Sequence, residues 1–150
     1  MLRRLEDDQG NLIGNMTDDT AGWAPYQKAP AAPETIERWL TKWPGCNLGI
    51  ITGAISGIVV LDVDSRHGGD ESLAKVPPLP PGPVVKTPNG RHFYFRHPGQ
   101  GVRIRNRWGK QDKPLPGLDI RGDGGYVVGP GSVVGGIMYT DMAEAGDDVA

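Results

Sequence analysis

The segment from Ile58 to Asp64 (IVVLDVD) constrains the fold more than any other part of this chain. Four apolar β-formers followed by Asp-x-Asp predict a strand whose side chains alternate between its two faces. Asp62 and Asp64 then lie on one face about 7 Å apart, close enough for both carboxylates to reach one pair of metal ions. Alternatively, the strand ends there and both side chains cap the following turn. Because a buried carboxylate needs a cation or a basic partner, we expect a sheet that carries a cation site.

A second strand-like segment, from Gly117 to Arg121, brings a third acid, Asp119. Arg121 follows two residues later on the same face, so a structural ion pair between these two residues is one interpretation. The three aspartates together favour metal binding. Two divalent cations, Mg²⁺ or Mn²⁺, would then neutralise a triphosphate and activate the attacking hydroxyl.

Between these two acidic segments lies an aromatic stretch, residues 87–96, which predicts a hairpin that turns at Pro88-Asn89-Gly90. In its second strand, His92 lies on the same face as Tyr94 and Arg96. Phe93 and Phe95 lie on the opposite face, which we expect to be buried. His92 should therefore project towards the same cleft as the carboxylates. A histidine there can donate to a phosphate oxygen, and the neighbouring Arg91 can clamp another.

Positive charge is concentrated in one part of the chain. Between Val84 and Arg121 there are nine Lys or Arg residues and two Asp residues, a local charge of +7, whereas the rest of the chain carries −9. The nine are Lys86, Arg91, Arg96, Arg103, Arg105, Arg107, Lys110, Lys113 and Arg121. Cations attract phosphates, and three of these arginines alternate beside Trp108, a pattern that suits single-stranded nucleic acid. The alternative is a solvated, charged loop.

Composition narrows the class of protein. With 23 Gly and 14 Pro in 150 residues, we expect short elements and many turns. The single cysteine, Cys46, excludes an internal disulfide and a cysteine-rich zinc site, so no zinc is expected. No apolar run reaches transmembrane length, and the first residues lack the apolar core of a signal peptide. We expect a cytoplasmic protein with no membrane partner.

Patterning along the chain predicts one catalytic domain over 22–140, between a poorly patterned N-terminal arm (1–21) and an acidic tail (141–150). In the arm, only a short strand near Leu12 is expected. Pro33 to Trp43 predicts a helix that turns Ile36, Trp39, Leu40 and Trp43 towards the core. Strands are expected at 47–53, 57–64, 84–87, 92–95, 118–121 and 126–128, with a helix within 65–75, an extended connector at 77–83 and an irregular basic loop at 98–116.

Four ordered motifs resemble the N-terminal domain of bifunctional primase–polymerases, within the archaeo-eukaryotic primase superfamily. They are the stretch Pro44 to Gly53 behind the predicted helix, the Leu61-to-Asp64 motif, Thr87 to Phe95, and Leu118 to Gly122 leading to Pro130-Gly131-Ser132. The resemblance extends from Gly22-Trp23 to about Ser132, more than a hundred residues.

The resemblance implies an α+β fold with mixed or antiparallel sheets, in which an αβ module and an RRM-like module enclose an active-site cleft. It implies a metal-dependent nucleotidyltransferase that joins NTPs or dNTPs on a DNA template or primer, in the replication of a phage, plasmid or other mobile element. A helicase, separate or fused in relatives, is an expected partner. The implied catalytic and metal-binding residues are Asp62, Asp64 and Asp119.

The expected nucleotide-binding residues are His92, Arg91, Arg121, Lys86 and Ser132, and the expected nucleic-acid contacts are Arg96, Arg103, Arg105, Arg107 and Lys110. Two other functions remain open. One is a catalytically degenerate module that binds nucleic acid or nucleotide for a replication protein. The other is a metal-dependent phosphodiesterase that uses the same acids.

Overall fold

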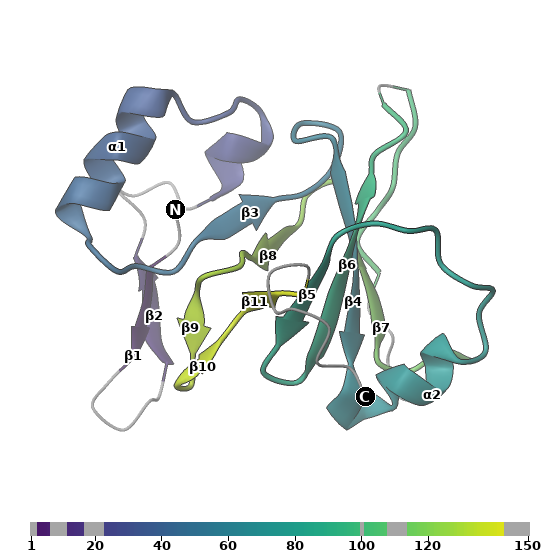
Figure 1. Ribbon diagram of the computed structural model, residues 1–150. Coiled ribbons are helices and arrows are strands. Elements are labelled where there is room, and N and C mark those ends of the chain that lie inside the picture. Colours follow the sequence, from purple (N-terminus) through teal and green to yellow (C-terminus); the bar gives the residue numbers. More distant parts are fainter. Residues whose placement is uncertain (1–2, 7–11, 17–22, 100, 108–113, 143–150) are drawn as a thin grey trace.

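A five-stranded antiparallel sheet forms the centre of the molecule (Figure 1). The computed structural model describes residues 3–6, 12–16, 23–99, 101–107 and 114–142. The sheet has the strand order β11-β5-β6-β4-β7. Its strands are β4 (Ile58–Asp64), β5 (Val84–Thr87), β6 (Gly90–Arg96), β7 (Leu118–Arg121) and β11 (Thr140–Asp141). The structure thus agrees with the predicted α+β class, for which mixed or antiparallel sheets were expected.

Both faces of this sheet are covered. Val60 and Val63 point to opposite faces of β4 because an odd number of residues separates them, and both are completely buried. The apolar run that predicts the strand therefore lies at the middle of the core. The β5–β6 hairpin turns at Pro88-Asn89-Gly90, as the sequence predicts. A side chain at Gly90 would overlap the carbonyl of Val63, so the close pairing of β4 with β6 requires glycine there.

A second group of elements lies beside one end of the sheet, on the left of Figure 1. It contains the 3₁₀ turn η2 (Ala24–Gln27), helix α1 (Pro33–Lys42) and strand β3 (Gly49–Ile51), which pairs with β8 (Tyr126–Val128). The hairpin of β9 (Val133–Val134) and β10 (Ile137–Met138) follows β8. β7 belongs to the central sheet and β8 to this second group, so the short turn between them joins the two.

The chain from residue 65 to 73 forms the short turn η3 (Ser65–His67) and helix α2 (Gly69–Leu73), which packs near β4 and β7. In the predicted N-terminal arm, β1 (Arg3–Glu6) and β2 (Leu12–Met16) form an antiparallel hairpin. Only part of this was expected, because the sequence favoured a strand near Leu12 but none before it. Asp141, assigned to the acidic tail, instead pairs with Val85 at the edge of the central sheet.

Helix α1 buries less of its apolar stripe than expected. Trp39 and Trp43 are buried, but Ile36 is 41% and Leu40 50% exposed, so the prediction that all four face the core is wrong for two of them. The helix packs by its Trp39 edge, where the ring of Tyr26 meets that of Trp39 edge-on at 5.2 Å. The surface by which α1 packs is therefore narrower than its apolar stripe. No helix in the described part of the chain is long and apolar enough to cross a membrane.

Candidate functional site

Three neighbouring strands carry one polar side chain each to the same level of the central sheet. In the antiparallel register, Asp62 of β4 is opposite His92 of β6 on one side and opposite Asp119 of β7 on the other. Directly opposite residues project to the same face of a sheet. The structure thus confirms that His92 faces the same side as the first and the third predicted acids, although these come from segments far apart in the sequence.

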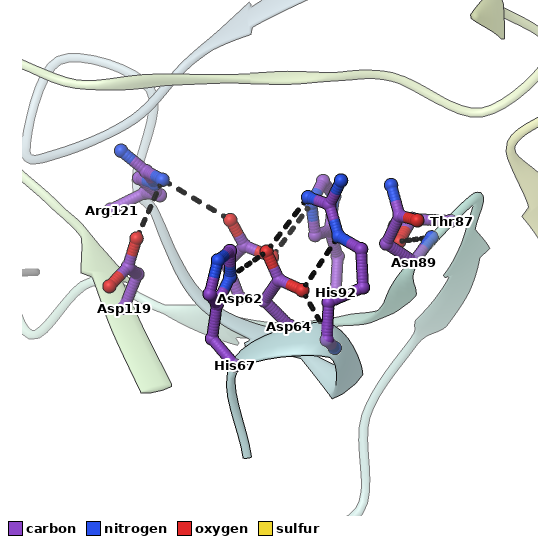
Figure 2. A network of polar contacts seen from close by, with 9 residues as sticks. Asp62, Asp64, His67, Thr87, Asn89, His92, Asp119 and Arg121 are labelled. Atoms are coloured by element: carbon purple, nitrogen blue, oxygen red, sulfur yellow. Dashed lines mark hydrogen bonds and ion pairs between the residues drawn. The ribbon is translucent and has the colours of Figure 1, made fainter. Parts of the chain in front are cut away.

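Arg121 joins the two acids. Its Nη2 donates to Oδ2 of Asp119 at 2.9 Å and to Oδ2 of Asp62 at 3.2 Å (Figure 2). On the other side of Asp62, Oδ1 lies 3.4 Å from Nε2 of His92. The side chains of both acids are 22% exposed, that of Arg121 is 25% exposed, and that of His92 only 7%. The predicted ion pair between Asp119 and Arg121 is present, and it also includes Asp62.

Burial alone would raise the pKa of the Asp62 carboxyl. The hydrogen bond and charge of His92, together with the guanidinium of Arg121, outweigh that effect and lower the pKa below its usual range. Asp62 is therefore held as a carboxylate in a partly buried position. A carboxylate under these conditions is a ready ligand for a cation.

The row of polar residues opens into a pocket of about 400 Å³ between the central sheet and β8. Asp62, His92 and Arg121 line its polar side. The other walls come from three aromatic residues, a strand segment, a glycine turn and one amide, namely Trp23, Tyr126, Tyr139, Val127, Val128, Gly124, Gly125 and Asn106. The rings of Trp23 and Tyr126 lie 5.0 Å apart, and that of Tyr139 lies 5.8 Å from His92. Charged groups and flat apolar groups therefore share one cavity.

Asn106 was not among the residues predicted from the sequence. Its Oδ1 accepts a hydrogen bond from the backbone N–H of Gly122 at 2.8 Å, which holds the amide at the pocket wall. A Cβ at Gly125 would clash with that oxygen, so the glycine turn makes room for Asn106. The aromatic wall was also missed as a group, since no local pattern connects Trp23, Tyr126 and Tyr139. The glycine-rich turn at 122–125 was the only sequence signal for this part of the pocket.

Asp64 occupies the end of β4, where the side chain caps the next turn. Its Oδ1 accepts from the backbone N–H of Arg66 at 3.0 Å, and the Arg66 side chain and Nδ1 of His67 contact Oδ2 at 3.0 and 2.9 Å. The side-chain hydrogen bond from Arg66, which outweighs the effect of burial, lowers the pKa of the Asp64 carboxyl. The capping alternative raised by the sequence describes Asp64, whereas Asp62 takes part in the row of polar residues.

A divalent cation fits the Asp62–Asp119 pair better than it fits all three aspartates in this arrangement. The two carboxylates already converge on one positive group, the Arg121 guanidinium, and oxygen ligands are the type that Mg²⁺ and Mn²⁺ prefer. Within the described ranges, no cluster of three or more His, Cys, Asp or Glu side chains could hold a metal ion. Asp64 would have to release Arg66 and His67 before it could join such a pair.

Two predicted nucleotide contacts lie on the opposite face of the sheet. Arg91 precedes His92 in β6, and Lys86 is opposite Arg91 in β5, so both project away from Asp62. Arg91 pairs instead with Asp70 of α2, and its guanidinium lies 5.7 Å from the ring of Phe93. Phe93, which we expected to be buried, is half-buried.

Ser132, the remaining predicted nucleotide contact, is buried and serves the backbone. Its hydroxyl accepts a hydrogen bond from the N–H of Leu48 at 2.9 Å. Its backbone N–H donates to the carbonyl of Gly129, and its carbonyl accepts from the N–H of Tyr139. Ser132 therefore ties the loop before β3 to the β8–β9 turn. It is absent from the pocket lining.

Three of the five predicted nucleic-acid contacts, Arg103, Arg105 and Arg107, form an exposed edge beside β7, which we call the arginine edge. Arg103, Arg105 and Arg107 are exposed and alternate with half-buried residues, as the sequence predicts. Arg107 bridges to Ile120, which projects away from Asp119, so this edge faces the side opposite the pocket. Arg96 ends β6 and is exposed, and Lys110 lies outside the described residues.

Comparison with known proteins identifies the family of this chain. No curated protein and no solved structure matches the chain. A family model described as "Bifunctional DNA primase/polymerase, N-terminal" matches residues 15–147, which includes every strand of the central sheet and every residue of the pocket. This chain belongs to the family of bifunctional DNA primase/polymerase N-terminal domains.

Proposed function

We propose that this chain is the catalytic core of a DNA primase/polymerase, which joins nucleoside triphosphates on a DNA template in the replication of a mobile element. Membership of the family implies nucleotidyl transfer with DNA and nucleotides as substrates. The observation that carries the proposal is the convergence of Asp62 and Asp119 on the Arg121 guanidinium, next to a pocket of about 400 Å³ that Asp62, Arg121 and His92 line. A pocket of this size accommodates a small ligand such as a nucleotide.

Asp62 and Asp119 would hold Mg²⁺ or Mn²⁺. When bound, the metal supplies charge neutralisation for the triphosphate and activates the primer hydroxyl. The low pKa of Asp62 keeps one ligand ionised at neutral pH without a proton to displace. Asp64 stands two residues away on the same strand and is the candidate for a further ligand, in exchange for its contacts with Arg66 and His67.

The polar side of the pocket would bind the triphosphate. His92 can supply a ring N–H to one phosphate oxygen, and the Arg121 guanidinium can pair with another. Both side chains line the pocket, and the sheet register fixes them next to the two acids. Donors that are held in place before the substrate arrives lower the free energy of the charged transition state with little reorganisation.

The aromatic side of the pocket would receive the nucleoside. Trp23 and Tyr126 present adjacent rings, and Tyr139 presents a third near His92. Flat rings of this kind stack on any of the four bases, as a polymerase that copies many templates requires. In this proposal the phosphates would lie near the acids and the base near the rings.

Primer extension tests the proposal directly. The purified protein should add labelled nucleotides to a primed template when Mn²⁺ or Mg²⁺ is present, and Asp62→Asn or Asp119→Asn should abolish the addition. An unprimed template distinguishes initiation from extension. A folded, metal-loaded protein that adds nothing to either template contradicts the proposal.

Two other results would favour the alternative functions. Release of nucleotides from a labelled strand without added triphosphates, lost in Asp62→Asn, would indicate a phosphodiesterase. Salt-sensitive DNA binding without extension, unchanged in Asp62→Asn and weakened at Arg105 and Arg107, would indicate a binding module. The exposed arginine edge is the observation that favours this second candidate.

A further inference from the structure

The side chain of Arg121 occupies the place where a metal-binding pair of acids needs its cation. A single nitrogen, Nη2, contacts one oxygen of Asp62 and one of Asp119, at 3.2 and 2.9 Å. Figure 2 shows the guanidinium between the two carboxylates. We propose that Arg121 is a built-in counter-ion that holds Asp62 and Asp119 together in the metal-free protein and leaves them for the triphosphate when a divalent cation binds. The inference rests on the proposed metal-dependent function and concerns the same site.

Charge balance favours the exchange. The two acids carry two negative charges, to which the Arg121 guanidinium brings one positive charge and a divalent cation would bring two. A divalent cation between the acids balances the pair completely, but it would then lie against the positive charge of Arg121. In a partly buried site that repulsion is poorly screened, so the guanidinium must move or the metal binds weakly.

The triphosphate gives Arg121 a new partner. The negative charge of the triphosphate exceeds that of the two acids. Guanidinium groups also bind phosphate oxygens through two parallel hydrogen bonds. Arg121 lines the same pocket and is 25% exposed, so its long side chain can turn into the cavity without leaving the sheet. One residue would thus couple metal binding to nucleotide binding.

Asp64 provides an internal comparison. Its partners, Arg66 and His67, have side chains that are 59% and 51% exposed, and exposed ion pairs of this type are weak. Arg121 is the more buried cation and touches two acids instead of one. We therefore expect Arg121, and not Arg66, to set the affinity of the metal-free protein for a divalent cation.

Binding of Mn²⁺ in the absence of nucleotide tests the exchange, with free Mn²⁺ measured by electron paramagnetic resonance. Arg121→Gln should bind Mn²⁺ roughly tenfold more tightly than the wild-type protein, because one competing positive charge is removed. Arg121→Lys keeps the charge and should stay near the wild-type affinity. Arg91→Gln is the matched control, since it removes an arginine from an Arg–Asp pair on the opposite face, and should change the affinity by less than about twofold.

Equal or weaker Mn²⁺ binding by Arg121→Gln would overturn the inference, and so would the absence of Mn²⁺ binding in both proteins. A second measurement uses the wild-type protein, in case Arg121→Gln does not fold. The Arg121 Nε–H signal in nuclear magnetic resonance, assigned by its loss in Arg121→Lys, should move when Mg²⁺ saturates the site, and a signal that stays in place would overturn the inference. If Arg121→Gln binds Mn²⁺ more tightly than the wild-type protein but the wild-type protein extends no primer, only the proposed function is contradicted.

Discussion

The two faces of the central sheet use the same strands for different purposes. On one face, Asp62, His92, Asp119 and Arg121 contact one another beside a pocket. On the other face, Arg91 forms a pair with Asp70 of α2, in which the side chains are 39% and 46% exposed. Both faces contain acids and arginines. They differ in how far these groups are buried and in whether more than two of them meet.

This difference shows what separates a candidate site from surface charge. An exposed pair such as that of Arg91 and Asp70 is solvated and contributes little free energy. A partly buried cluster retains its electrostatic strength and shifts pKa values, as it does for Asp62. Because residues alternate along β6, a step of one position moves a side chain from the first environment to the second.

The strongest test of whether the two faces differ in function is to remove one acid from each face. Asp62→Asn should lower kcat/KM for primer extension by about 100-fold or more, because it removes a charged ligand from the site. Asp70→Asn should change it by less than about threefold, since its partner is exposed. Thermal unfolding checks that both variants fold. Similar losses in both would show that the two faces do not differ in function.

A second comparison uses adjacent residues of β6. His92→Gln should lower kcat/KM by about 10- to 100-fold, because it removes a donor that lines the pocket. Arg91→Gln should have an effect of less than about threefold. Steady-state primer extension at varied nucleotide concentration measures both. If Arg91→Gln proves the more damaging, the nucleotide binds on the α2 side of the sheet.

Much of the fold could be predicted from the sequence because its signals are local. The run from Ile58 to Leu61 indicates a buried strand, and Pro88-Asn89-Gly90 indicates the turn of the next hairpin. The limits of α1 follow from Pro33 and from Pro44-Gly45. The burial of individual α1 residues could not be predicted, since it depends on which elements happen to pack there.

The candidate site could be predicted only as a set of residue types. Alternation correctly placed His92 on the side of Asp62, and the same rule, had it been applied to Arg91 and Lys86, would have placed them on the other face. The bridging position of Arg121 depends on the register of β4 with β7, which no local pattern specifies. Asn106 reaches the pocket from an irregular segment, where sequence patterns carry little information.

A third prediction concerns an aspartate that lies outside the row of polar residues on the sheet. Asp123 accepts hydrogen bonds from the backbone N–H groups of Ala54 and Ile104, both at 2.8 Å. Asp123→Ala should destabilise the protein by about 1–3 kcal/mol, because it leaves two backbone donors without their acceptor. Urea unfolding at neutral pH measures the loss. Asp70→Ala, an exposed acid, should cost less than about 0.5 kcal/mol.

The stability difference at Asp123 should depend on pH. The hydrogen bond from the Ala54 N–H, aided by Ile104 and by the nearby His97, lowers the pKa of the Asp123 carboxyl in the folded protein. A lowered folded-state pKa stabilises the protein above the unfolded value of about 3.9, and this contribution is lost as the pH falls through the folded-state pKa. The gap between the wild-type protein and Asp123→Ala should therefore be constant above about pH 5 and narrow below about pH 4. A gap that widens on acidification would contradict this assignment.

The smallest expected effect concerns the arginine edge, which faces away from the pocket. If Arg105 and Arg107 bind the template backbone, Arg105→Gln with Arg107→Gln should weaken DNA binding by a few fold at moderate salt. It should also reduce the slope of log K against log salt by about 0.7 to 0.9 for each phosphate that an arginine no longer neutralises. Extension at saturating template should stay within about twofold of wild type, because neither side chain lines the pocket. An unchanged slope would show that the template is held elsewhere, whereas a fall in extension at saturating template would show that the edge and the pocket act as one site.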